Sequence, residues 1–96
     1  MPAYWIGQYD VLDKAKYETY ASTAGAILTE KYGAKVVAYG PATQHLEGPE
    51  PKQTVIVLEF PNREKAEAAW KDADYQKARA ARIGALEIQL SIVDGM

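Results

Sequence analysis

Glu59 is the leading candidate for a residue that does chemistry. It ends the most apolar stretch of the chain, residues 54–58 (TVIVL), and a helix-start signal at Asn62 follows it closely. A carboxylate near the carboxyl end of a central strand could act as a general base if its surroundings tune its proton affinity. The structural alternative is an ion pair with Arg82 or Arg79, or with a partner chain, because buried acids in small domains are usually paired.

His45 is the second catalytic candidate, because it is the only side chain of a type that titrates near neutral pH. If its segment, residues 43–47 (TQHLE), extends a strand past a β-bulge, His45 and Glu47 project on one side. The Glu47 carboxylate could then orient the His45 imidazole, or the two side chains could be part of a metal or haem site. The alternative is a loop histidine in a stretch rich in proline and glycine. With one histidine and no cysteine, we expect no protein-built metal site and no other cofactor.

Aromatic residues form a third group of candidates. The chain has seven tyrosines and two tryptophans, and the tyrosines exceed what a core of this size requires. If the predicted helices stand slightly off the sheet, these rings would wall an apolar pocket, with hydroxyls pointing inward, that suits a flat small molecule. The alternative is an ordinary aromatic core. The candidate ligand-binding residues are Tyr4, Tyr17, Tyr20, Trp70, Tyr75 and Arg82.

Arg82 is the charged member of this set. It stands near the end of a predicted helix, where the helix dipole favours a cation, so capping or pairing is one role. Its planar guanidinium could instead hold a substrate carboxylate or enolate by two parallel hydrogen bonds.

Composition disfavours several classes of function. The net charge is −2, and the basic residues between Arg63 and Arg82 alternate with acids, as on a solvated helix rather than a nucleic-acid-binding stripe. There is no cysteine, hence no disulfide, and no phosphate-loop, GxGxxG, HExxH or GxSxG motif. No apolar run approaches a membrane span and no signal peptide is recognisable. We therefore expect a cytoplasmic protein that binds neither membrane nor nucleic acid.

Helices and strands that would position these residues follow from the hydrophobic periodicity. Asp13 and Asn62 are predicted N-caps, and Gly33 and Gly84 are predicted to end helices. The predicted elements are a strand at 3–9, a helix between Asp13 and Gly33, strands at 34–39 and 53–60, a helix at 63–71, a break at 72–74, a helical piece at 75–82 and a strand at 86–93.

The order of these elements predicts the fold. Tyr9 and Phe60 end equivalent strands and Gly33 and Gly84 end equivalent helices, and each pair is 51 residues apart. Two such β-α-β halves fit the ferredoxin-like α+β sandwich, in which both helices lie on one face of a four-stranded antiparallel sheet. The strand order would be four, one, three, two, in one domain spanning residues 1–96.

Both central strands of that sheet are apolar on both faces. Strand three shows Ile56 and Leu58 on one side and Val55 and Val57 on the other, whereas the last strand, LEIQLSIV, alternates apolar and polar residues. Leaving such side chains in water would forgo roughly 1.5–3 kcal/mol each. Because two helices cover only one face, we expect a homodimer in which two sheets meet as a closed barrel.

Short motifs along nearly the whole chain carry a family resemblance. They are Tyr4-Trp5-Ile6, the tyrosines of the first helix, Lys31-Tyr32-Gly33, Leu46-Glu47-Gly48, Glu59-Phe60-Pro61, Ala66, Ala69, Trp70, Tyr75, Arg82 and Val93-Asp94-Gly95. In these the chain resembles a domain-of-unknown-function family of short bacterial proteins within the dimeric α+β-barrel superfamily. The resemblance implies the fold and the dimer. It supplies no catalytic residues, and the superfamily includes cofactor-independent monooxygenases, lactone isomerases, haem-handling enzymes and stress-response dimers.

Two functions fit these residues. One is a homodimer that binds a small apolar or aromatic ligand between helices and sheet, with or without a cofactor-free catalytic step. The other is a non-enzymatic stress-response or regulatory dimer that has no catalytic site.

Overall fold

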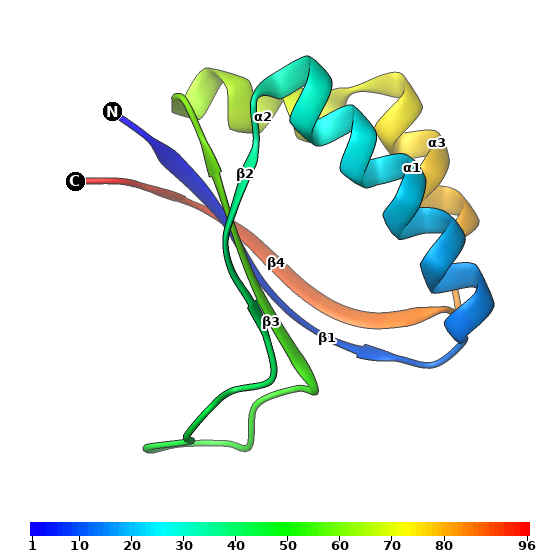
Figure 1. The fold of residues 1–96 in the computed structure, drawn as a ribbon, viewed down its shortest axis with the longest axis vertical. Helices are drawn as coiled ribbons and strands as arrows, with labels where there is room; N and C mark the ends of the chain where they lie inside the picture. The colour runs from blue at the N-terminus through cyan, green and yellow to red at the C-terminus, as the bar shows by residue number, and fades with distance from the viewer.

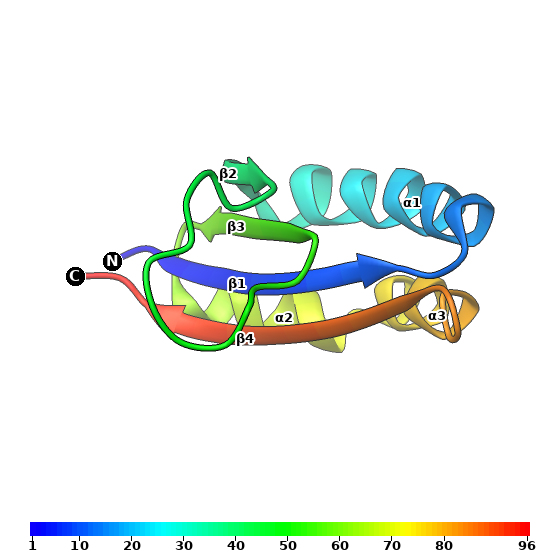
Figure 2. The ribbon, with the colours of Figure 1, turned by 90° about the horizontal axis from the view of Figure 1, so that it is seen from below.

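The computed structural model describes residues 1–96, and its three helices all lie on one face of a four-stranded antiparallel sheet (Figure 1). In chain order the elements are β1 (Ala3–Val11), α1 (Lys14–Tyr32), β2 (Lys35–Gly40), β3 (Thr54–Phe60), α2 (Arg63–Lys71), α3 (Ala73–Ala81) and β4 (Leu86–Asp94). The strands lie in the order β2-β3-β1-β4, as Figure 2 shows from below. The predicted ferredoxin-like α+β class and strand order are confirmed.

Local signals set the ends of α1 as predicted. The Asp13 side chain accepts a hydrogen bond from the backbone N–H of Lys16, which satisfies one of the free donors of the first turn. At the other end Gly33 takes the left-handed conformation, with φ 70°, and its N–H bonds to the Thr29 carbonyl. Asn62 caps α2 in the same way as Asp13, through the N–H of Lys65.

The second helical region is broken where predicted, but α3 begins two residues earlier than expected. The Asp72 side chain accepts a hydrogen bond from the N–H of Tyr75 at 2.8 Å, so Asp72 is the N-cap of α3. Ala73 and Asp74 therefore form the first turn of the helix instead of a gap. The helix ends at Ala81, and Arg82 is its C-cap.

No strand forms in residues 43–47, so this segment is part of a connection, and the alternative in which it extends a strand through His45 is wrong. The β-bulge lies inside β2, between Val36 and Ala38. Three prolines between positions 41 and 51 remove backbone donors that a ladder would need. This connection extends away from the helices (Figure 1), and His45 Nε2 lies 2.8 Å from the Gly48 carbonyl oxygen within it.

The core lies between the helices and the sheet and is centred on Trp5. Its indole N–H donates to the Ala66 carbonyl at 3.1 Å, and its ring lies 5.2 Å from Phe60 and 5.4 Å from Tyr75, centroid to centroid. Phe60 and Tyr75 are fully buried. Buried alanines at positions 66 and 69 let α2 approach the sheet closely.

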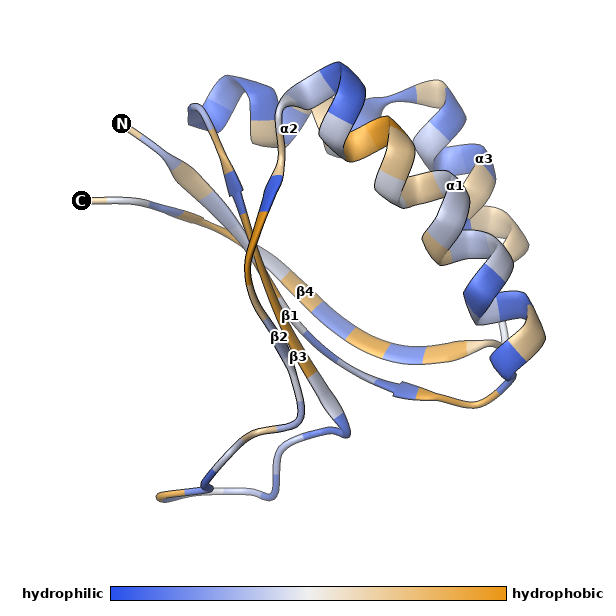
Figure 3. Ribbon diagram, viewed as in Figure 1, coloured by the Kyte–Doolittle hydropathy of each residue, from blue (hydrophilic) through white to orange (hydrophobic).

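One face of the sheet is covered by the helices, and the other face is not. On β4, Leu86, Ile88 and Leu90 are partly buried on the helix side and alternate with exposed polar residues, as the colour change along the strand shows (Figure 3). No helix covers the opposite face, where Ile6 pairs with Val57 at the centre and is 39% exposed. The apolar residues predicted on both faces of the central strands are therefore present.

Candidate ligand-binding site

A cavity of about 160 Å³ lies between α1, α3 and the helix side of the sheet. Most of its wall is aromatic or aliphatic. Its aromatic wall residues are Trp5 and Tyr9 from β1, Tyr17 and Tyr20 from α1, and Tyr75 from α3. Arg82, directly after α3, completes this wall, so the structure brings four of the six predicted ligand-binding residues around one space.

Two tyrosines of the cavity wall, Tyr9 and Tyr17, form a hydroxyl cluster with Tyr39 of β2, which lies outside the wall. The Tyr9 and Tyr17 oxygens are 2.7 Å apart, and the exposed Tyr39 hydroxyl lies 3.5 Å from that of Tyr9 and 3.3 Å from that of Tyr17. Burial raises the pKa of Tyr9 and of Tyr17, whereas hydrogen bonds received from both lower the pKa of Tyr39. Sequence reasoning missed Tyr39, although its place on the second predicted strand was available as a signal.

A second pair of hydroxyls joins α1 to α3 at the cavity wall. The Tyr20 and Tyr75 oxygens are 2.9 Å apart, and burial raises the pKa of Tyr20, so this phenol stays neutral. When two hydroxyls share one hydrogen bond, one O–H hydrogen is left for a third group. The pair can therefore donate a hydrogen bond to a bound molecule.

Arg82 is the charged group of the cavity wall. It is 6% exposed, its Nη1 atom is buried without a hydrogen-bond partner, and its Cζ lies 4.6 Å from the centre of the Tyr20 ring. The ring face and the carboxyl end of α3 both favour a cation here. Arg82 is the C-cap residue of α3 through its backbone N–H, and no carboxylate pairs with its side chain.

Glu59 lies on the other face of the sheet and is only partly buried. It accepts a hydrogen bond from the Tyr4 hydroxyl at 3.2 Å, so Tyr4 also lies outside the cavity. Because alternate residues of a strand face opposite sides, and Leu58 and Phe60 face the helices, Glu59 must point away from them. The expected ion pair with Arg82 or Arg79 is therefore wrong for this chain by itself.

Trp70 and His45 also lie away from the cavity. The Trp70 ring packs against Trp5 at 6.2 Å, and the Arg79 guanidinium lies 4.9 Å above it. His45 and Glu47 are exposed on the connection between β2 and β3. The structure brings neither His45 nor Glu59 to the cavity, and their assignment as catalytic residues stays a prediction.

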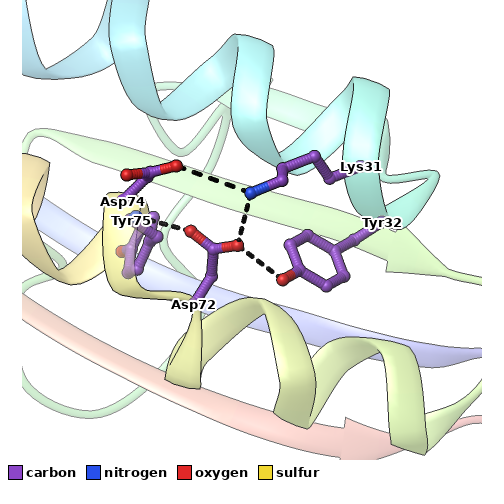
Figure 4. A network of polar contacts seen from close by, with 5 residues as sticks. All are labelled: Lys31, Tyr32, Asp72, Asp74 and Tyr75. Atoms are coloured by element: carbon purple, nitrogen blue, oxygen red, sulfur yellow. Dashed lines mark hydrogen bonds and ion pairs between the residues drawn. The ribbon is translucent and has the colours of Figure 1, made fainter.

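A polar cluster around the buried Asp72 joins α1 to the α2–α3 break (Figure 4). Asp72 Oδ2 accepts from the Tyr32 hydroxyl at 2.6 Å and lies 2.9 Å from Lys31 Nζ, which also lies 3.6 Å from Asp74. The Tyr32 hydrogen bond, the N–H of Tyr75 and the bond from Lys31 hold the pKa of Asp72 well below its usual range. Sequence reasoning noted only the break, although an aspartate three residues before a helical Tyr75 is an N-cap pattern.

No group of three or more histidine, aspartate and glutamate side chains is arranged to hold a metal ion. None of the helices is long and apolar enough to cross a membrane.

A family model described as "Domain of unknown function (DUF1330)" matches residues 2–96. The chain belongs to the DUF1330 family. This membership confirms the resemblance drawn from the sequence motifs. No protein among those with curated descriptions matches this DUF1330 chain.

Solved structures confirm the fold of this DUF1330 protein. Methylated RPA0582 is 22% identical with a TM-score of 0.80, and the match covers 99% of this chain and 81% of the other. A second structure of RPA0582 is described as a protein of unknown function from Rhodopseudomonas palustris. A dimeric ferredoxin-like protein of unknown function from Thermobifida fusca is 12% identical, with TM-score 0.62 and coverages of 99% and 92%.

One similar structure has a described activity. SnoaB, a cofactor-independent oxygenase from Streptomyces nogalater, is 8% identical, with a TM-score of 0.65 and coverages of 99% and 93%. At this identity the likeness shows a shared fold and carries no activity over to the DUF1330 chain.

Proposed function

We propose that this DUF1330 protein binds a small flat molecule with one apolar or aromatic ring in the cavity between α1, α3 and the sheet. The cavity itself is the observation that carries the proposal. It measures about 160 Å³ and is walled by aromatic and aliphatic side chains. An apolar protein cavity of about 150 Å³ accepts benzene, so a single ring fits the available space.

A groove on the outer side of the α1–α3 pair adjoins the cavity. Lys16, Thr19, Asp74 and Lys77 line this groove together with Tyr20, which also lines the cavity. Tyr20 is thus part of both the groove wall and the cavity wall.

The binding proposal is tested by NMR titration of the ¹⁵N-labelled protein with toluene and with benzamide, both uncharged. We expect both rings to bind and to shift backbone amides around the cavity, including those of Leu28 and Leu90. Ala21→Leu, which places a larger side chain on the cavity wall, should weaken binding at least about tenfold by removing room for the ring. Ala26→Leu is the matched control, because Ala26 is exposed and outside the wall.

Two results would contradict the proposal. Absence of amide shifts with both compounds at millimolar concentration would remove it. Equal loss of affinity in Ala21→Leu and Ala26→Leu would show that the rings bind somewhere other than the cavity.

We infer, in addition, that the protein is a homodimer formed through the uncovered face of the sheet. On that face, Ile6 is 39% exposed and Val93 is 45% exposed in the single chain. Val55 and Val57 of β3, which pairs with β2, are partly buried there. Burial of such side chains favours association. The Thermobifida fusca protein of the same fold is described as dimeric. In this arrangement Glu59 would lie at the interface between the two sheets.

A further inference from the structure

We propose that the ligand is a single-ring carboxylate, such as a benzoate, whose carboxylate group is held by Arg82. The inference rests on the proposed binding function and specifies the chemical class of the ligand. It is carried by the burial of Arg82, by its missing partner and by the absence of acids from the cavity wall.

The guanidinium of Arg82 is a buried charge. Arg82 is 94% buried and its Nη1 atom has no hydrogen-bond partner. The six ion pairs of the protein involve other cations, namely Lys14, Lys31, Lys52 and Arg63. A buried cation without a counter-charge is unfavourable, and the face of the Tyr20 ring compensates only part of that loss. A bound carboxylate would supply the missing partner.

The cavity wall around this charge carries hydrogen-bond donors and no acid. No aspartate or glutamate lines the cavity, so Arg82 is its only charged side chain. The Tyr20–Tyr75 hydroxyl pair, which has one hydrogen left to donate, lies on the same wall. A guanidinium and a phenol are both donors, and a planar carboxylate accepts from several donors at once. The polar groups of the wall therefore match an anion rather than a cation.

The charge of the adjoining groove and the volume of the cavity also fit an anion with one ring. The outer groove carries Lys16 and Lys77 against one carboxylate, Asp74, which also lies 3.6 Å from Lys31. The positive excess of the groove would attract an anion toward Tyr20. The cavity volume of about 160 Å³ limits the apolar part of the ligand to one ring.

The test compares benzoate with benzamide, which has the same ring and shape but no charge, by isothermal titration calorimetry. We expect the wild type to bind benzoate at least about tenfold more tightly, as a charge-assisted hydrogen bond predicts. Arg82→Met should abolish this preference, so that benzoate and benzamide bind with about equal affinity. Arg82→Lys, which keeps the charge but loses the planar fork, should retain a reduced preference.

Arg79→Met is the matched control. Arg79 is also a cation of α3, but its guanidinium stacks on Trp70 outside the cavity, so this variant should keep the full preference for benzoate. Chemical denaturation of each variant checks the fold. If Arg82→Met proves unfolded, the wild type, Arg82→Lys and Arg79→Met still decide the question.

Each outcome separates this proposal from the binding function on which it rests. Equal affinity of the wild type for benzoate and benzamide would overturn the carboxylate assignment and leave ring binding intact. Loss of the preference in Arg79→Met as well would show a general charge effect and would also overturn it. Failure of both compounds to bind would remove the binding function itself.

Discussion

Asp72 shows how one carboxylate can hold three helices in place. Its two oxygens accept hydrogen bonds from the Tyr32 hydroxyl at the end of α1 and from the N–H of Tyr75 in α3. Asp72 directly follows α2 and is the N-cap of α3. The same contacts raise the pKa of Tyr32 and of Lys31, in each case chiefly through the hydrogen bond to Asp72. The charge of this residue is therefore part of the fold.

Asp72→Asn should lower the stability of the protein at neutral pH. It should also make the stability less dependent on pH in the acid range. Because the pKa of Asp72 is depressed in the folded state, its contribution is fully present above about pH 4, the ordinary range of an aspartate, and is lost as pH falls through the folded value. Urea denaturation should therefore show a gap between wild type and variant that is wide near neutrality and narrows below about pH 3.

Asp74→Asn is the control for this prediction. Its side chain is 73% exposed and lies 3.6 Å from Lys31, so the substitution should change stability little. A constant gap between wild type and Asp72→Asn across the acid range would contradict the assignment. On the alkaline side, the raised pKa values of Lys31 and Tyr32 place the loss of their contribution above about pH 10.

At the scale of the element, the glycine inside α1 and the glycine that ends it have opposite roles. Gly25 lies in the helix interior, where an added Cβ would meet nothing within 4 Å, so Gly25→Ala should stabilise the protein by about 0.5–1 kcal/mol. Gly33 has φ 70° and its added Cβ would lie 3.3 Å from Pro61 Cγ, so Gly33→Ala should destabilise by about 1–2 kcal/mol. Urea denaturation of both variants measures the difference, and effects of equal sign would contradict it.

At the scale of the whole molecule, the homodimer proposal rests on the uncovered face of the sheet. Multi-angle light scattering should give twice the mass of the 96-residue chain for the wild type. Val57→Glu places a charge at the centre of that face, next to Ile6, and should give a monomer because two such charges would meet across the two-fold axis.

The matched control is Ala80→Glu, which adds the same charge to an exposed position of α3 on the other side of the molecule and should leave the dimer intact. Circular dichroism checks that both variants are folded. A wild type that remains monomeric at high concentration would overturn the homodimer proposal.

The sequence by itself determined the order of the elements, most of their bounds and the strand order of the sheet. These follow from local preferences, such as the caps at Asp13 and Asn62 and the left-handed glycine at position 33, which act within one turn of the chain. The alternation of side chains along β3 also places Glu59 on the opposite sheet face from Leu58 and Phe60.

Only the tertiary structure decided which of these residues meet. Tyr4 and Glu59 are 55 residues apart in the chain, Tyr20 and Tyr75 are also 55 apart, and Tyr32 and Asp72 are 40 apart. Such contacts depend on which sheet face the helices cover and on where packing leaves a cavity, and no local preference encodes either. Arg82 could therefore be predicted as a helix end from the sequence, but its burial without a counter-charge is a property of the folded molecule.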